Sequence, residues 1–177
     1  MYNDKPILAI SGDSRAGKDT IAGLIRNIVG IPYVHSTSYA AALLIWADIQ
    51  SEHDCRFPMT LPHYETMEEL YADRVNHRRF WADWIDNYNR KNQQGIGLYL
   101  LSCSQGNQIL TGIRKTKEIL LCQERKLVDL TIWVHRPGNP RDSTQEYGSE
   151  LCDIIIENQG LERTIEKLHH LFGNTLK

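Results

Sequence analysis

The nine residues from 12 to 20 decide the fold, and they are Gly12-Asp13-Ser14-Arg15-Ala16-Gly17-Lys18-Asp19-Thr20. Before them comes an apolar run at residues 6–11, whose length and composition predict a buried strand. After them the apolar residues are spaced as on one face of a helix. A strand, a glycine loop and a helix in this order form the context that a phosphate-binding P-loop requires. The pattern G-x-x-x-x-G-K is met in full.

The residue types in this loop suit phosphate binding. Gly12 and Gly17 let the backbone curl so that its N–H groups point inward at phosphate oxygens, and the helix N-terminus adds partial positive charge there. Lys18 can reach the β- and γ-phosphates, and Arg15 either points to phosphate or is solvated. The residues predicted to bind ATP are Gly12, Asp13, Ser14, Arg15, Ala16, Gly17, Lys18, Asp19 and Thr20. The alternative is a glycine-rich turn that caps an ordinary helix.

The position after Lys18 departs from the motif. Asp19 stands where a Ser or Thr normally ligates Mg²⁺, and Thr20 comes one residue later. Either Asp19 holds the metal through a water molecule, or Thr20 takes over as the ligand. We therefore predict a Mg²⁺ ion beside the ATP, with Asp19 and Thr20 as its candidate ligands.

The composition predicts one domain over residues 1–177. Hydrophobic residues make up 41% of the chain, which is enough for a core. The formal net charge of −2 argues against a broadly basic nucleic-acid-binding surface, although a local basic groove is compatible with it. No apolar stretch approaches the length of a membrane span, and Met1 leads almost at once into the first strand without a targeting segment. We therefore expect a cytoplasmic protein with no membrane partner.

The cysteines and histidines do not predict a structural metal. No cysteine belongs to a C-x-x-C pair, so buried thiols in a reducing compartment are expected at Cys55, Cys103, Cys122 and Cys152. His53, Cys55 and His63 lack the spacing of zinc ligands. The sequence leaves the oligomeric state open.

Strand and helix patterns alternate along the chain. Helices are predicted at residues 18–29, 39–49, 65–92, 112–125 and 161–172, and strands at residues 6–11, 31–34, 108–112, 130–134 and 153–158. Residues 65–92 form either one helix or two, and residues 98–102 fit either a strand or a helix. This alternation predicts an α/β fold with a parallel sheet of about five strands flanked by helices.

The carboxyl edge of such a sheet is where ligands bind. Residues 12–20, Arg114, Arg136 and Asn158 would all emerge at this edge, from four separate loops. Residues 50–95 are predicted to form a largely helical insertion on the acceptor side.

Three arginines within the predicted insertion could bind an anionic acceptor. Arg74 and Arg78 are four residues apart and would share a helix face, with Arg79 beside them. A guanidinium group can clamp phosphate with two hydrogen bonds. The alternative is a solvated basic face.

Further arginines follow the later strands. Arg136 and Arg141 lie in a proline-glycine loop and could close on the phosphates as a lid formed by residues 135–150, or else be solvated. Arg114 follows a buried strand and is predicted to bind phosphate or acceptor, the alternative being an ion pair with Glu118. Lys18, Arg114, Arg136 and Arg141 are thus the predicted catalytic cations.

Two further roles stay open. Asn158 either lies near the adenine of ATP or holds the turn into the last helix. Asp13, Asp19 and Asp48 are the candidates for accepting the acceptor's proton, and none stands out.

The chain resembles a known family. Residues 12–20, Gly112-Ile113-Arg114-Lys115-Thr116-Lys117-Glu118, Arg136 with Arg141, and residues 153–160 together resemble the phage deoxynucleoside monophosphate kinase group. The resemblance covers nearly the whole chain, but only the P-loop is specific by itself. It implies a nucleoside-kinase-like P-loop NTPase fold, ATP with Mg²⁺, and a nucleotide acceptor. By position it assigns residues 12–20 to the phosphates, Arg114 to the acceptor, and Arg136 and Arg141 to the lid.

A branch of this group is more similar to the chain. The group usually carries a Phe-Ala-Asp-Pro-Leu-Lys pattern after its second strand, whereas residues 38–44 here are Ser-Tyr-Ala-Ala-Ala-Leu-Leu. The chain resembles the phage 5-hydroxymethyl-deoxyuridine DNA kinases, which implies phosphorylation of the base hydroxymethyl group in DNA. The arginines at 74, 78 and 79, with Trp81 and Trp84, would then suit a DNA backbone and an extruded base. The alternatives are a deoxynucleoside monophosphate kinase and a nucleotide-binding switch without transfer activity.

Overall fold

A computed structural model describes residues 6–51, 61–92, 95–103, 106–139 and 145–173, and for residues 33, 98, 102 and 103 it describes the backbone alone. Arg141 lies outside the described residues. The elements, in chain order, are β1 (Ile7–Gly12), α1 (Lys18–Val29), β2 (Tyr33–Ser36), α2 (Thr37–Gln50), α3 (Met67–Asp73), α4 (Arg78–Lys91), α5 (Gly95–Cys103), β3 (Gln108–Thr111), α6 (Thr116–Glu124), β4 (Leu130–His135), the 3₁₀ turn η1 (Ser149–Leu151), β5 (Ile154–Glu157) and α7 (Leu161–Phe172).

The strands form one parallel sheet in the order β2-β3-β1-β4-β5, which confirms the predicted five-stranded parallel sheet. β1 is the central strand and pairs with β3 on one side and β4 on the other. The chain leaves β1 toward β2 and later crosses β1 to reach β4. In open parallel sheets a reversal of this kind opens a crevice at the carboxyl ends of the strands. By this rule the crevice is expected where β1 ends.

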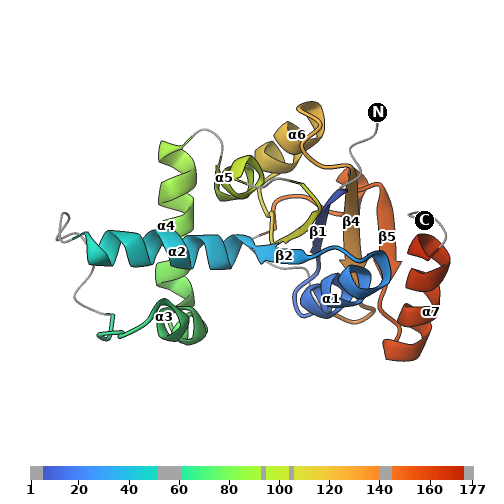
Figure 1. Cartoon of the computed structure of the whole chain (residues 1–177), viewed down its shortest axis with the longest axis horizontal. Helices are drawn as coiled ribbons and strands as arrows, with labels where there is room; N and C mark the ends of the chain where they lie inside the picture. Colours follow the sequence, from blue (N-terminus) through green and yellow to red (C-terminus); the bar gives the residue numbers. More distant parts are fainter. Residues whose placement is uncertain (1–5, 52–60, 93–94, 104–105, 140–144, 174–177) are drawn as a thin grey trace.

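Helices cover both faces of the sheet, and β1 contributes to both cores because its successive side chains point to opposite faces. On one face Leu8 and Ile10 pack with residues of α1 and α7, such as Ile25 and Leu168. On the other face Ala9 packs with residues of α5 and α6, such as Leu101 and Ile119. Figure 1 shows α1 and α7 beside the strands, and α5 with α6 above them.

The helices that follow β2 have a core of their own. Ala41 and Ile45 of α2, Leu70 of α3 and Trp81 of α4 are buried in one cluster together with Ile96 of α5. In Figure 1, α2, α3 and α4 extend to the left, away from the sheet, beginning at the carboxyl end of β2. Within the described part of the chain no helix is long and apolar enough to cross a membrane.

Several predicted boundaries were wrong. β2 runs two residues further than the prediction, because residues 33–36 pair with β3 and the Ser36 hydroxyl then caps α2 by accepting a hydrogen bond from the Tyr39 amide at 3.0 Å. Residues 95–103 form a helix, which settles the open assignment of residues 98–102. The helix predicted from residue 112 begins only at Thr116, since Gly112 has a φ of 92° that no helix contains.

The helical stretch predicted over residues 65–92 contains two helices, one of the two arrangements that the sequence leaves open. α3 ends at Asp73 and α4 begins at Arg78. The Asp73 carboxylate accepts a hydrogen bond from Asn76 Nδ2 at 2.5 Å and pairs with His77 Nε2 at 3.0 Å. Side chains that bond locally in this way compete with helix continuation.

Candidate phosphate-binding site

The loop between β1 and α1 has a backbone that only its glycines permit. Gly12 has a φ of 147°, and a Cβ there would overlap the Val134 carbonyl oxygen of the neighbouring strand. Gly17 is left-handed, with a φ of 89°, and a Cβ there would lie 2.7 Å from Asn158 Nδ2. Arg15 also has a positive φ, of 56°, which is uncommon outside glycine and concentrates at functional loops. The loop is therefore curled as the motif predicts.

Most of the loop amides remain open. The Asp13 amide donates to Val134 O at 3.0 Å and the Ala16 amide donates to Asp13 O at 3.3 Å. Within the described residues, no acceptor is bonded to the amides of Ser14, Arg15, Gly17, Asp19 and Thr20. A concave run of amides at a helix N-terminus is an anion site.

Lys18 lies over this loop. Its Nζ donates to the carbonyl oxygen of Asp13 at 2.6 Å and to that of Gly12 at 3.1 Å. The half-buried ammonium group is thus held at the loop, where it adds positive charge to the open amides.

Side chains from later strands brace the loop. Asn158, just after β5, donates from Nδ2 to Ala16 O at 2.8 Å. Asn139, after β4, donates from Nδ2 to Ser14 O at 3.0 Å. These contacts place Asn158 against the loop. Its Oδ1 also accepts the Gly160 amide at 3.3 Å, which favours the alternative that it holds the turn into α7.

The candidate Mg²⁺ ligands are both exposed in the first turn of α1. Asp19 and Thr20 offer oxygen atoms, which suit Mg²⁺, next to the open amides. Among the described residues, no group of three or more His, Cys, Asp or Glu side chains is placed to hold a metal ion. The assignment of Asp19 and Thr20 to Mg²⁺ stays a prediction.

The segment after β3 is fixed by a buried hydrogen-bond cluster. The Ile113 carbonyl oxygen accepts from the Ser11 hydroxyl and from the Tyr147 hydroxyl, both at 3.0 Å. Burial raises the pKa of Tyr147 and keeps the phenol neutral. This cluster holds the backbone just before Arg114, whose own carbonyl oxygen accepts the Glu146 amide at 2.9 Å.

Two of the predicted catalytic arginines, Arg114 and Arg136, are exposed at the expected edge. Arg114 follows β3 and Arg136 follows β4, and both side chains are exposed. Asp48, one candidate proton acceptor, is exposed near the far end of α2, eleven residues after Thr37. At about 1.5 Å per residue it lies roughly 16 Å along that helix from the end of β2.

The prediction that Arg74 and Arg78 share a helix face was wrong, because α3 ends before Arg74 and α4 begins at Arg78. Arg78 is exposed, and Arg79 Nε lies 3.9 Å from Asp83 Oδ2 with both side chains largely in solvent. Arg74 differs, since its guanidinium stacks 3.9 Å from the Tyr71 ring centroid and donates to Tyr71 O at 2.8 Å.

Sequence reasoning missed the cluster that orders Arg74. The Tyr71 ring packs edge-on against Tyr39, with 5.4 Å between ring centroids, and its hydroxyl lies 3.4 Å from Ser36 Oγ at the end of β2. β2 is two strands from β1, a lateral distance of about 10 Å. Arg74 is half-buried and has no acidic partner within the described residues, so it is an ordered cation at the same edge as the loop. No local sequence signal pairs Tyr39 with Tyr71.

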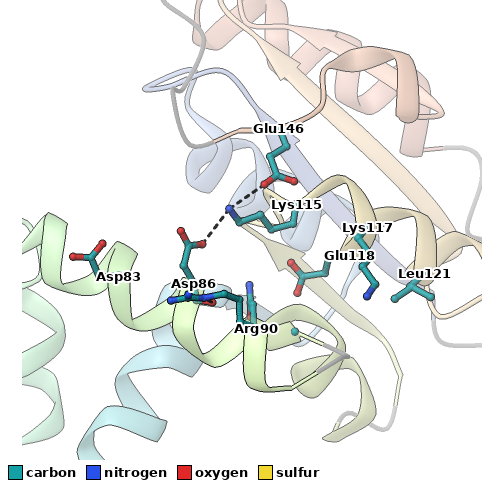
Figure 2. Close-up of a pocket in the computed structure, with 10 residues that line it drawn as sticks. Asp83, Asp86, Arg90, Lys115, Lys117, Glu118, Leu121 and Glu146 are labelled. Carbon is teal, nitrogen blue, oxygen red and sulfur yellow. Dashed lines mark hydrogen bonds and ion pairs between the residues drawn. The ribbon is translucent and has the colours of Figure 1, made fainter. Parts of the chain in front are cut away.

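A separate cleft of about 600 Å³ lies between α4, α5 and α6. Figure 2 shows Lys115 reaching between Asp86 and Glu146, and its Nζ lies 3.1 Å from a carboxylate oxygen of each. Burial alone would lower the pKa of Lys115, but the two carboxylates outweigh burial and raise it. No residue predicted from the sequence to bind ATP lines this cleft.

Comparison with solved structures supports the fold described above. No protein-family model matches the chain, and no curated protein matches it. Among solved structures it is similar to TT1252 from Thermus thermophilus, with a TM-score of 0.52 and 18% identity, covering 97% of this chain and 98% of that one. It is also similar to shikimate kinase from Aquifex aeolicus, with a TM-score of 0.47 and 11% sequence identity, covering 95% of this chain and 99% of that one. For the APS kinase of Mycobacterium tuberculosis the TM-score is 0.42 and the sequence identity is 11%, with 94% of each chain covered.

These findings define the class of fold. A five-stranded parallel sheet flanked by helices, with a glycine loop between its central strand and the first helix, is an α/β P-loop NTPase fold. At such low identities the similarity shows the fold alone.

Proposed function

We propose that this protein is an ATP-dependent phosphotransferase that acts on a nucleotide acceptor. The observation that carries the proposal is the loop itself: the amides of Ser14, Arg15 and Gly17 are open toward an anion, with the Lys18 ammonium held over them. Phosphoryl transfer needs positioning and positive charge more than covalent chemistry. ATP with Mg²⁺ would supply the phosphoryl group and part of the neutralising charge.

Different residues of the chain would bind the phosphates, neutralise charge and hold the metal. The loop amides bind phosphate oxygens, Lys18 neutralises charge that develops during transfer, and Asp19 with Thr20 would hold the metal. Arg114, Arg136 and Arg141 would surround the moving group and exclude water. In the reaction the bond between the acceptor oxygen and the γ-phosphorus forms, the bond from that phosphorus to the oxygen of ADP breaks, and an acceptor hydroxyl releases its proton to water.

The 5-hydroxymethyl group of 5-hydroxymethyluracil in phage DNA is the proposed acceptor, a step in thymine hypermodification. The sequence resemblance supports it, and the exposed Arg78 and Arg79 at the start of α4 could contact a DNA backbone. Trp81 is buried in the helical core and is not available to an extruded base, contrary to expectation. Trp84 stacks on Tyr88 with 5.4 Å between centroids.

A free deoxynucleoside monophosphate is the second candidate acceptor. Arg74 favours it, because one ordered guanidinium, stacked on the Tyr71 ring whose hydroxyl lies 3.4 Å from Ser36 Oγ at the end of β2, suits a single small phosphate. Deoxynucleoside diphosphates would then be the products.

One assay separates these proposals. The protein is incubated with γ-labelled Mg-ATP and either duplex DNA containing 5-hydroxymethyluracil, the same duplex with thymine, or free monophosphates. Label in the first duplex alone supports the DNA kinase, and label in diphosphates alone supports the second candidate. The Lys18→Ala protein is the control and should transfer no label. Binding of ATP without transfer to any acceptor would support a nucleotide-binding switch instead.

A further inference from the structure

The phosphate-binding loop carries a negative charge of its own. Asp13 directly follows Gly12, and its side chain is only 10% exposed, so little water stabilises the carboxylate. A carboxylate in this place repels the phosphate groups that the loop is proposed to bind. Phosphate binding is therefore easier when a cation compensates Asp13.

The compensating group is His135, the last residue of β4. Its Nδ1 lies 2.5 Å from Asp13 Oδ2, and the imidazole is 45% exposed, so protons can reach it. The pair is fixed by backbone contacts, because Val134 O accepts the Asp13 amide at 3.0 Å and His135 O accepts the Asn158 amide at 2.7 Å. The backbones of the two residues are thus held side by side.

Other charged groups surround the imidazole. From the loop, Lys18 Nζ donates to the Asp13 carbonyl oxygen at 2.6 Å, while His135 Nδ1 contacts the Asp13 carboxylate. From β5, Glu157 is the register partner of His135 and points to the same face of the sheet. Arg136 is the next residue along the chain. Within the described residues the carboxylate of Asp13 is bonded to His135 alone.

We infer that His135 takes up a proton when a nucleoside triphosphate binds the loop, an inference that rests on the function proposed above. Histidine is the side chain whose charge changes between about pH 5 and 8. As imidazolium it cancels the charge of Asp13, and bound phosphates add negative charge that favours the imidazolium further. By linkage, triphosphate affinity then falls as pH rises through this range, by up to about tenfold per pH unit. His135 is thus a positioning residue that acts through Asp13.

The test is calorimetric titration of the protein with Mg-ATP at pH 7.5 in buffers of different ionisation enthalpy, which counts the protons taken up. On binding Mg-ATP, the wild-type protein should take up more protons than the His135→Gln protein, and the difference should be a sizeable fraction of one proton. His77→Gln is the matched control, because His77 also pairs with an aspartate, Asp73 at 3.0 Å, but lies between α3 and α4. It should take up as many protons as the wild type.

Equal proton uptake by wild-type and His135→Gln proteins would overturn the inference while leaving the proposed function intact. Failure of wild-type protein to bind Mg-ATP would overturn both. A second measurement needs no variant: the ¹⁵N imidazole signals of His135 report its protonation in the wild-type protein at pH 7.5. Addition of Mg-ATP should raise the protonated fraction, and an unchanged or lower fraction would refute the inference even if His135→Gln protein does not fold.

Discussion

Replacement of Gly17 by alanine should destabilise the protein through two separable effects. Gly17 is left-handed, with a φ of 89°, and that conformation costs a residue with a Cβ about 1–2 kcal/mol. The new Cβ would also lie 2.7 Å from Asn158 Nδ2 and push this amide off Ala16 O, breaking a 2.8 Å hydrogen bond worth about 1 kcal/mol. The free energy of unfolding should therefore fall by about 2–3 kcal/mol.

A double-mutant cycle isolates the second effect. Asn158→Ala alone removes the hydrogen bond to Ala16 and should lower stability by about 1 kcal/mol or somewhat more, because Asn158 Oδ1 also accepts the Gly160 amide at 3.3 Å. In this background Gly17→Ala should cost only its backbone strain, so the two changes should couple by about 1 kcal/mol. Urea unfolding of the four proteins measures the coupling. Additive effects, with a coupling near zero, would refute the proposed contact between Asn158 and the loop.

Three further predictions concern the surroundings of the site. Lys115→Met should lower the free energy of unfolding by roughly 1 kcal/mol or less, with a smaller effect at high salt, because its ion pairs are partly exposed; an effect that salt does not change would contradict this. Hydrogen bonds, first from Asn76, lower the pKa of Asp73, so its contribution to stability is present above the usual aspartate range and is lost as pH falls through the lowered value. The stability difference between wild-type and Asp73→Asn proteins, measured by urea unfolding, should accordingly shrink toward acid pH, and a constant difference would refute it. Burial raises the pKa of both Cys122 and Cys152 to about 12. Iodoacetamide at pH 8 should therefore leave both thiols unmodified in the folded protein and modify them in urea, which mass spectrometry can measure. Labelling at equal rates in the folded and unfolded protein would contradict this.

The parts of the fold that local sequence determines were predicted well. The loop glycines, Lys18 and the first helix are close in sequence, and the structure confirms α1 at the predicted residues 18–29. Alternation of strands and helices gave the parallel sheet, because that order leaves few other arrangements. The strand order itself is a long-range property that no local pattern determined.

The errors fell where distant contacts outweigh local pattern. His35 and Ser36 are polar, yet they extend β2 because β3 offers hydrogen-bond partners. The apolar run at residues 98–102 carries no clear period, so only its packing in the core beside α6 settled it as helix. Two long-range contacts at the site, Asp13 with His135 and Tyr39 with Tyr71, join residues that are far apart in the sequence. Neither has a sequence signature.

Equilibrium binding of Mg-ATP to wild-type and Lys18→Met proteins tests most directly whether the loop at residues 12–20 holds a triphosphate. Lys18 supplies the cation at the loop, so its removal should weaken binding at least about tenfold, equivalent to about 1.4 kcal/mol, while the fold is retained. Saturable binding by the wild type with this loss in the variant is the expected result. No binding by the wild type, or equal affinity in both proteins, would contradict a triphosphate site in this loop.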